Sequence, residues 1–214
     1  MKGIAKLAYV TTAMIGFFLL ARRVRHGDTG DLDARITRTL QNVDGPWFRR
    51  GMHAVSWPGF PPQSRIIPWL LPASMLVAGR RLEAIFQLLG WGTGAISGSV
   101  KFVVKRPRPN LPGVIVAPAR LGGTSFPSGH VIIYTGVYGI LAYLAHCHIH
   151  IRVLRRAITA ALTAMIVFVG PSRVYLGHHW FSDVLASYLL GTSYLLAITS
   201  LYQRVRRRKL ARSS

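Results

Sequence analysis

The chain has 214 residues, half of them hydrophobic, and its 27 Lys and Arg residues far outnumber the 6 Asp and Glu residues. The hydrophobic residues gather in long runs instead of alternating with polar ones, which excludes an ordinary soluble domain with a periodic core. The single cysteine, Cys147, excludes an internal disulfide. Much of the basic charge falls in loops between the apolar runs, so membrane surfaces and phosphates are better candidate partners than nucleic acid.

Six apolar runs follow one another along the chain. Runs of about 20 residues with few charges are typical of membrane-spanning helices, although the second and fifth runs are shorter. We therefore predict an all-α integral membrane protein that forms a single domain over residues 1–214, with six transmembrane helices. The runs cover residues 4–21, 66–79, 84–104, 131–147, 157–170 and 184–201.

The first run has the basic start of a signal peptide, because it carries Lys2 and Lys6. It ends at Ala21-Arg22-Arg23 without a small-residue cleavage pattern, which favours an uncleaved helix. In the third run, Gly90, Gly94 and Gly98 recur every four residues and predict close packing against another helix.

Residues 22–65 form a polar connection after the first run. The segment DLDARITRTL places Leu32, Ile36 and Leu40 four residues apart, which predicts a short helix along the membrane interface. The stretches GPWFRR and SWPGFPPQ then predict turns with aromatic anchors at the membrane edge. A packed surface loop is an equally good interpretation of this region.

Six spans place both termini on the same side of the membrane. The basic tail over residues 204–214 and the compact loop 148–156 favour the cytoplasmic side for the termini, although the Lys and Arg residues divide evenly between the two sides. The loop after the third run and the loop after the fifth run must then share the outer face. This shared side follows from the number of spans, whichever way the chain inserts.

The stretch SRVYLGHHWFSD, residues 172–183, joins the fifth and sixth runs. If a helix begins near His179, that residue and Asp183 lie one turn apart on one face. The carboxylate would fix the tautomer of the imidazole and leave its other nitrogen as a nucleophile. His178 lies about 100° away around the helix, so the spacing selects His179. A structural pair that holds the helix end is the alternative.

The stretch Pro127-Ser128-Gly129-His130 precedes the fourth run. Ser128 is suited to cap a helix, and Gly129 lets a ligand approach the backbone closely. The exposed amides and the helix dipole would make an anion site, beside which His130 could donate a proton. An ordinary helix start with an incidental histidine is the alternative.

The stretch KFVVKRPRP, residues 101–109, supplies cations, and Arg173 adds another beside the third stretch. Arginine can grip two oxygens of a phosphate, whereas lysine acts as a point charge. Alone, such a loop would be expected to touch lipid headgroups. Together the three stretches place cations, an anion site and two histidines on one membrane face, which suits phosphoryl transfer. The cations of the first stretch are Lys101, Lys105, Arg106 and Arg108.

These three stretches resemble the three-part signature of the type 2 phosphatidic acid phosphatase (PAP2, lipid phosphate phosphatase) superfamily. The matching pattern is Lys101-x6-Arg108-Pro109, then Pro127-Ser128-Gly129-His130, then Ser172-Arg173-x5-His179-x3-Asp183. All three parts agree in order and spacing, and the six-span layout extends the resemblance over nearly the whole chain. The resemblance implies a helical-bundle active site at the outer, non-cytoplasmic face and metal-independent removal of phosphate from a lipid phosphate.

The resemblance also implies a role for each residue of the signature. His179 would be the nucleophile that forms a phosphohistidine, and Asp183 would orient it. His130 would protonate the leaving oxygen and then activate water. The residues that would bind the phosphate are Lys101, Arg108, Ser128, Gly129 and Arg173.

No metal or cofactor is predicted. Magnesium and calcium sites are built from several oxygen ligands, largely carboxylates, and Asp183 is the sole acid in the three stretches. The stretch HCHIH, residues 146–150, has a composition that can bind zinc or copper. Because it lies at the opposite end of the fourth run from His130, we expect interfacial or solvated histidines there.

We therefore predict a membrane phosphatase that acts on a lipid phosphate through a phosphohistidine. Candidate substrates are polyprenyl diphosphate, phosphatidate, phosphatidylglycerol phosphate and the phosphates of lipid A. A lipid phosphotransferase with the same intermediate and a non-catalytic protein that binds anionic lipids are the alternatives. The compact chain, without recognisable eukaryotic targeting signals, favours the bacterial inner (plasma) membrane. The expected partners are the substrate and membrane lipids, without nucleic acid, and the sequence indicates no particular protein partner.

Overall fold

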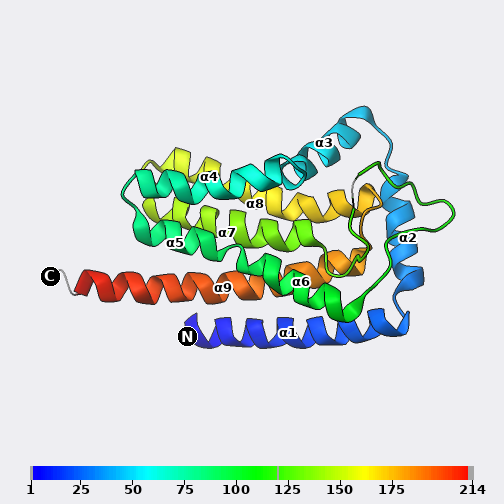
Figure 1. The fold of residues 1–214 in the computed structure, drawn as a ribbon, viewed down its shortest axis with the longest axis horizontal. Helices are drawn as coiled ribbons and strands as arrows, with labels where there is room; N and C mark the ends of the chain where they lie inside the picture. Colours follow the sequence, from blue (N-terminus) through cyan, green and yellow to red (C-terminus); the bar gives the residue numbers. More distant parts are fainter. Residues whose placement is uncertain (1, 120, 212–214) are drawn as a thin grey trace.

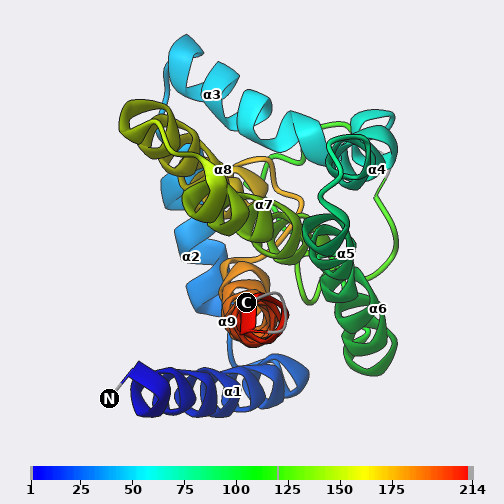
Figure 2. The same cartoon turned by 90° about the vertical axis from the view of Figure 1, so that its left-hand side faces the viewer.

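The structure, a computed structural model, describes residues 2–119 and 121–211 and contains helices but no strands within that part of the chain. Most of the helices run side by side in a bundle (Figures 1 and 2). Arg120 and residues 212–214 of the basic tail, for which a loop and a cytoplasmic tail were predicted, lie outside the described residues. In chain order the elements are α1 (Lys2–His26), α2 (Gly30–Gln41), α3 (Pro46–Ser56), the short 3-10 helix η1 (Trp57–Gly59), α4 (Gln63–Val77), α5 (Arg81–Leu89), α6 (Gly92–Val104), α7 (Gly129–His148), α8 (Arg152–Tyr175) and α9 (Phe181–Ala211).

Among the described residues, four helices are long and apolar enough to cross a membrane: α1, α7, α8 and α9. With 20 residues, α7 is about 30 Å long, which matches the hydrocarbon core of a bilayer. Figure 2 shows α7 between α8, α5 and α9. In agreement with this central place, 61% of its apolar stretch is buried inside the protein, against 11% for α8. The predicted class of helical membrane protein is therefore confirmed.

The second and third predicted spans correspond to shorter helices. The predicted single helix over residues 84–104 is wrong, because the chain there forms α5 and α6, of 9 and 13 residues. The break falls at Gly90, whose carbonyl accepts a hydrogen bond from the Thr93 hydroxyl at 2.7 Å. A Cβ at Gly90 would lie 3.1 Å from the Cα of Val137 in α7, so this glycine permits the predicted close packing. A count of six full spans remains a prediction.

The polar connection 22–65 is largely helical. The short helix predicted from DLDARITRTL is confirmed as α2, which lies across the end of the bundle in Figure 1. The turn predicted at GPWFRR is wrong, since this stretch begins α3. Gly45 has a φ of 151° and Pro46 occupies the first turn of α3, where its fixed φ suits a helix and its missing N–H is not needed.

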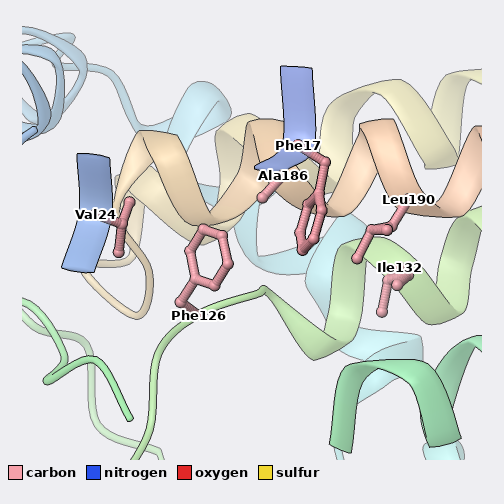
Figure 3. Close-up of a cluster of buried hydrophobic side chains, with 6 residues drawn as sticks. All are labelled: Phe17, Val24, Phe126, Ile132, Ala186 and Leu190. Carbon is pink, nitrogen blue, oxygen red and sulfur yellow. The ribbon is translucent and has the colours of Figure 1, made fainter. Parts of the chain in front are cut away.

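A buried apolar cluster joins α1, α7 and α9 to the segment that leads into α7 (Figure 3). Phe126, at the tip of that segment, is fully buried. Its ring stacks on that of Phe17 in α1, with 6.1 Å between the ring centroids. This packing holds the backbone just before Ser128 in a fixed place. The cluster consists of Phe17, Val24, Phe126, Ile132, Ala186 and Leu190.

Candidate active site

The three stretches that the sequence singled out meet at the end of the bundle covered by α2. The segment between α6 and α7 and the turn between α8 and α9 are joined by backbone and side-chain hydrogen bonds. The amide of Ala117 donates to the carbonyl of Leu176 at 2.9 Å, and Nε2 of His178 lies 2.8 Å from the carbonyl of Ala117. The amide of Ser128 donates to the carbonyl of Asp183 at 3.3 Å. His178 therefore helps to hold the segment before α7 against the turn between α8 and α9.

His179 and Asp183 are both buried and face each other. Nδ1 of His179 lies 3.5 Å from Oδ2 of Asp183, which is long for a hydrogen bond. Catalytic hydrogen bonds are often long without a ligand and tighten when one binds. His179 precedes α9, which begins at Phe181, so the two residues face each other across the helix start instead of along one helical turn. The same Oδ2 accepts a hydrogen bond from the amide of Trp180 at 2.9 Å and another from the hydroxyl of Ser125.

The surroundings of His179 favour its neutral form. Burial, together with the charges of Arg173 and Arg108, lowers the pKa of His179 to about 3, against the opposing effect of Asp183. At neutral pH the imidazole therefore keeps a lone pair. With Nδ1 turned toward Asp183, that lone pair belongs to Nε2, which lies 3.4 Å from Nη1 of Arg108.

Three cationic side chains act on the His179–Asp183 pair: Arg108 and Arg173 on His179, and Lys101 on Asp183. Nζ of Lys101 donates to the carbonyl of Thr124 at 2.9 Å. Arg108 donates from Nε to the carbonyl of Gly122 at 2.5 Å and from Nη1 to that of His178 at 2.7 Å. Lys101 and Arg108 thus bind backbone carbonyls of the segment before α7 and of the turn before α9. Both side chains have further N–H groups that could bind a ligand.

Arg173 is the most buried of the three cations, with 0% of its surface exposed. Its Nη1 lies 3.3 Å from the hydroxyl of Ser56, and its guanidinium carbon lies 4.9 Å from the centre of the Phe60 ring. Its Nε and Nη2 are buried and have no hydrogen-bond partner among the described residues. A buried guanidinium with unused donors is costly unless an anion completes it.

The start of α7 provides the third side of the site. Ser128 occupies the predicted cap position with an extended backbone, ψ 112°, but its side chain does not cap the helix. Its hydroxyl and Nε2 of His130 are both buried, and neither has a hydrogen-bond partner in the part of the chain that the structure describes. A Cβ at Gly129 would meet nothing within 4 Å, so open space lies in front of this amide. The groups that act electrostatically on His130 include Arg173, His179 and Arg108.

Buried polar groups in folded proteins nearly always have partners, so several unpartnered ones at one place indicate a missing ligand. At this end of the molecule, the atoms without a partner among the described residues belong to Ser128, His130 and Arg173, besides Nδ1 of His178 and of His179. Ser128, His130 and Arg173 belong to the stretches 127–130 and 172–183. The remaining stretch, 101–109, supplies Arg108 beside Nε2 of His179. All eight residues predicted for the site lie at this end of the molecule. We call the arrangement of these eight residues the cationic cup. It combines positive charge and hydrogen-bond donors with one imidazole lone pair, which suits a tetrahedral oxyanion.

A cavity of about 270 Å³ reaches this cup from the side of α4. It is lined by His130 and Gly129 and by apolar and aromatic residues that include Pro68, Trp91 and Tyr138. A larger groove of about 760 Å³ between α2, α8 and α9 contains none of the predicted site residues. The smaller cavity is therefore the one connected with the chemistry.

Three residues around Asp183 were not predicted from the sequence. Arg106 and Ser125 bind Asp183 directly, and Asp33 binds Arg106. Arg106 was counted only among the loop cations, and no role was predicted for Asp33 or Ser125. In the structure Arg106 makes salt bridges of 2.7 Å with both Asp33 and Asp183. One available signal was the spacing of Asp33 and Thr37, which form a buried polar stripe on α2.

The histidines of the stretch HCHIH lie at the other end of α7. His148 is partly buried, with 19% of its side chain exposed, and it makes specific contacts within the bundle. Its Nε2 lies 2.7 Å from the hydroxyl of Tyr202 and 3.2 Å from Oε1 of Glu83. This contact ties α5, α7 and α9 together away from the cationic cup.

The fold is that of a helical membrane protein, and the cup is a cationic site suited to an oxyanion. The family model described as the PAP2 superfamily matches residues 83–207, more than half of the chain, so this protein belongs to the PAP2 superfamily of lipid phosphatases. The resemblance drawn from the three stretches is confirmed.

Comparison with individual proteins agrees with this family. The chain is 26% identical to "Phosphatidylglycerophosphatase B" of Bacillus subtilis (strain 168) over 195 residues, which cover 89% of this chain and 93% of that protein. Its fold is similar to that of a PAP2-type phosphatidylglycerolphosphate phosphatase from Bacillus subtilis, with a TM-score of 0.79 at 23% identity, covering 92% and 96% of the two chains. Aquifex aeolicus LpxE has a similar fold, with a TM-score of 0.63 at 20% identity, covering 79% of this chain and 95% of that chain.

Proposed function

We propose that the protein hydrolyses a lipid phosphate through a phosphohistidine at His179. The observation that carries this proposal is the set of buried, unpartnered polar atoms on Ser128, His130 and Arg173, at the end of the bundle where Nε2 of His179 faces Arg108. A phosphate group has enough acceptor oxygens to satisfy all of these donors at once. Such preorganised donors stabilise the charge that spreads over the phosphate oxygens in the transition state.

In the proposed reaction, Nε2 of His179 attacks phosphorus while the bond to the lipid oxygen breaks. His130, as the acid, gives its proton to that oxygen, and the dephosphorylated lipid leaves. His130 then takes a proton from a water molecule, which attacks the phosphohistidine and releases inorganic phosphate. Asp183 accepts from Nδ1 of His179 and stabilises the positive charge that develops on the ring.

The reaction needs no metal in this proposal. Both oxygens of Asp183 already accept hydrogen bonds, from Arg106 on one side and from Ser125 and the Trp180 amide on the other. Lys101, Arg108 and Arg173 supply the positive charge that a metal ion would otherwise bring. An excess of a chelator should therefore change the rate of phosphate release by less than about twofold.

We propose a phosphorylated membrane lipid as the substrate, with phosphatidylglycerol phosphate as the first candidate. The relatives named for this lipid support that choice, and the apolar cavity beside His130 could receive the part of the lipid next to the phosphate. Polyprenyl diphosphate, phosphatidate and lipid A phosphates are the comparison substrates. The site would face the outer side of the bacterial inner membrane, with both termini in the cytoplasm.

The test is release of phosphate from these four lipids by the purified protein in detergent. We expect release by the wild type and by His146→Ala, an exposed histidine at the far end of α7, but none above background by His179→Ala. Equal rates for His179→Ala and wild type would overturn the proposal. If the lipid phosphate is consumed faster than inorganic phosphate appears, the phosphoryl group has passed to another lipid, and the reaction is transfer instead of hydrolysis.

A further inference from the structure

A second buried carboxylate lies close to the site. Asp33 in α2 is 0% exposed, as is Asp183. The chain has only 6 acidic residues, and burying a carboxylate is costly unless charged or polar partners replace the water. The surroundings of Asp33 therefore call for an explanation in terms of its partners.

Arg106 joins the two carboxylates. Its Nη1 lies 2.7 Å from Oδ1 of Asp183, and its Nη2 lies 2.7 Å from Oδ2 of Asp33. The guanidinium is itself largely buried, with 10% of its side chain exposed. Each carboxylate thus receives one arm of the same cation, in charge-assisted hydrogen bonds of the strong kind.

Polar groups of Ser182 in α9 and of Thr29, the residue before α2, complete this arrangement. The amide of Ser182 donates to Oδ1 of Asp33 at 2.8 Å, and its hydroxyl donates to Oδ2 at 2.7 Å. The same hydroxyl accepts from Nη1 of Arg106 at 2.7 Å. The hydroxyl of Thr29 accepts from Nη2 of Arg106 at 3.0 Å. Asp33 is therefore held directly against the first turn of α9, next to Asp183.

The sharing of one cation by two carboxylates affects how strongly Asp183 binds His179. If Asp33 were neutral, the charge of Arg106 would act mainly on Asp183 and make its other oxygen a weaker acceptor. The imidazole would then be less firmly oriented, and the positive charge formed during attack would be less stabilised. We propose that Asp33 is a positioning residue, which acts on His179 through Arg106 and Asp183; this inference rests on the proposed role of His179.

The test is the isosteric variant Asp33→Asn, with Asp31→Asn as the matched control on the exposed face of the same helix. We expect kcat of Asp33→Asn to fall about tenfold, while KM and competitive inhibition by inorganic phosphate stay within about twofold, because the cup is unchanged. Arg106→Gln should show the same pattern, with Lys105→Gln as its exposed neighbour control.

The double variant Asp33→Asn/Arg106→Gln separates positioning from simple docking of α2. If Asp33 acts through Arg106, the double variant should be no slower than Arg106→Gln alone. Losses of kcat that multiply, or an Asp33→Asn enzyme with wild-type kcat, would overturn the inference. Should Asp33→Asn fail to insert, Arg106→Lys makes the same test, since an ammonium group keeps the charge but loses the two-armed bridge.

The same assay includes His179→Ala, so that two kinds of failure are distinguishable. An active His179→Ala enzyme contradicts the proposed function itself. An inactive His179→Ala enzyme beside a fully active Asp33→Asn enzyme contradicts the positioning role alone.

Discussion

Nε2 of His179 lies 3.4 Å from Nη1 of Arg108, so the imidazole lone pair and a guanidinium face each other directly. A phosphate oxygen bound by Arg108 would bring phosphorus within reach of that lone pair. The geometry links phosphate binding to attack, because the same arginine also holds the carbonyl of His178, the residue before the nucleophile.

The first prediction concerns this arginine. Arg108→Lys keeps the charge but loses either the bond to Gly122 or the bond to His178, together with one contact to phosphate. We expect kcat/KM for phosphate release to fall on the order of 100-fold, similar to the loss of one oxyanion donor in other enzymes. Arg38→Lys is the control, since exposed Arg38 binds the same loop at Pro112. A variant Arg108→Lys with wild-type kcat/KM would contradict a direct role.

The second prediction concerns Arg173, whose buried charge lacks a full set of partners. Replacing it with methionine removes that charge and keeps much of the volume. We expect the thermal unfolding midpoint of Arg173→Met in detergent to be equal to or above that of the wild type, while phosphate release falls at least about 100-fold. Inorganic phosphate should raise the midpoint of the wild type and leave that of the variant unchanged. A markedly lower midpoint without phosphate would show that Arg173 stabilises the fold instead.

The third prediction tests the space around His130. Gly59 in η1 packs so closely that a Cβ there would overlap the imidazole of His130. Gly59→Ala should displace this ring and lower kcat about 100-fold, since small misplacements of catalytic groups have effects of that size. Gly51→Ala is the control, because a Cβ at Gly51 in α3 would meet nothing within 4 Å. Equal kcat values for the two variants would count against His130 as the acid.

The fourth prediction concerns stability against pH. Burial lowers the pKa of His179 to about 3 and that of His178 to about 4. In the unfolded chain both residues titrate near their ordinary pKa of about 6.5. Below that pH the unfolded state binds protons that the folded state does not, so the free energy of unfolding decreases as the pH falls from about 6.5 toward 4.

Thermal unfolding in detergent between pH 7.5 and pH 4.5 measures this effect. The midpoint should fall with pH in the wild type, and the slope should be smaller in His178→Gln and in His179→Gln. Removing exposed His150 should leave the slope as it is. A wild-type midpoint that stays constant across this range would be incompatible with two buried neutral histidines.

The fifth prediction concerns orientation in the membrane. Asn110 and His150 are exposed and lie in loops at opposite ends of α7. In a Cys147→Ser background, Asn110→Cys should react with a membrane-impermeant maleimide in intact spheroplasts. His150→Cys should react only after permeabilisation. The reverse pattern would place the site on the cytoplasmic side.

The helices and the signature residues could be predicted from the sequence because both depend on local information. Long apolar runs predict helices wherever the chain lies in a bilayer, and α1, α7, α8 and α9 agree with the runs. The pairing of His179 with Asp183 followed from a spacing of four residues, even though α9 begins after His179.

The tertiary structure alone decided the features that depend on contacts distant in sequence. The break between α5 and α6 lies where Gly90 meets the backbone of α7, which no pattern within the run revealed. In the sequence, Asp33 lies in a polar connection, where a solvent-exposed carboxylate would be expected. It becomes a buried partner of Arg106, 73 residues away, because α2 lies across the end of the bundle and excludes water from both. Hydropathy determines which segments enter the membrane, whereas the burial of a charge depends on which partners the packed helices bring to it.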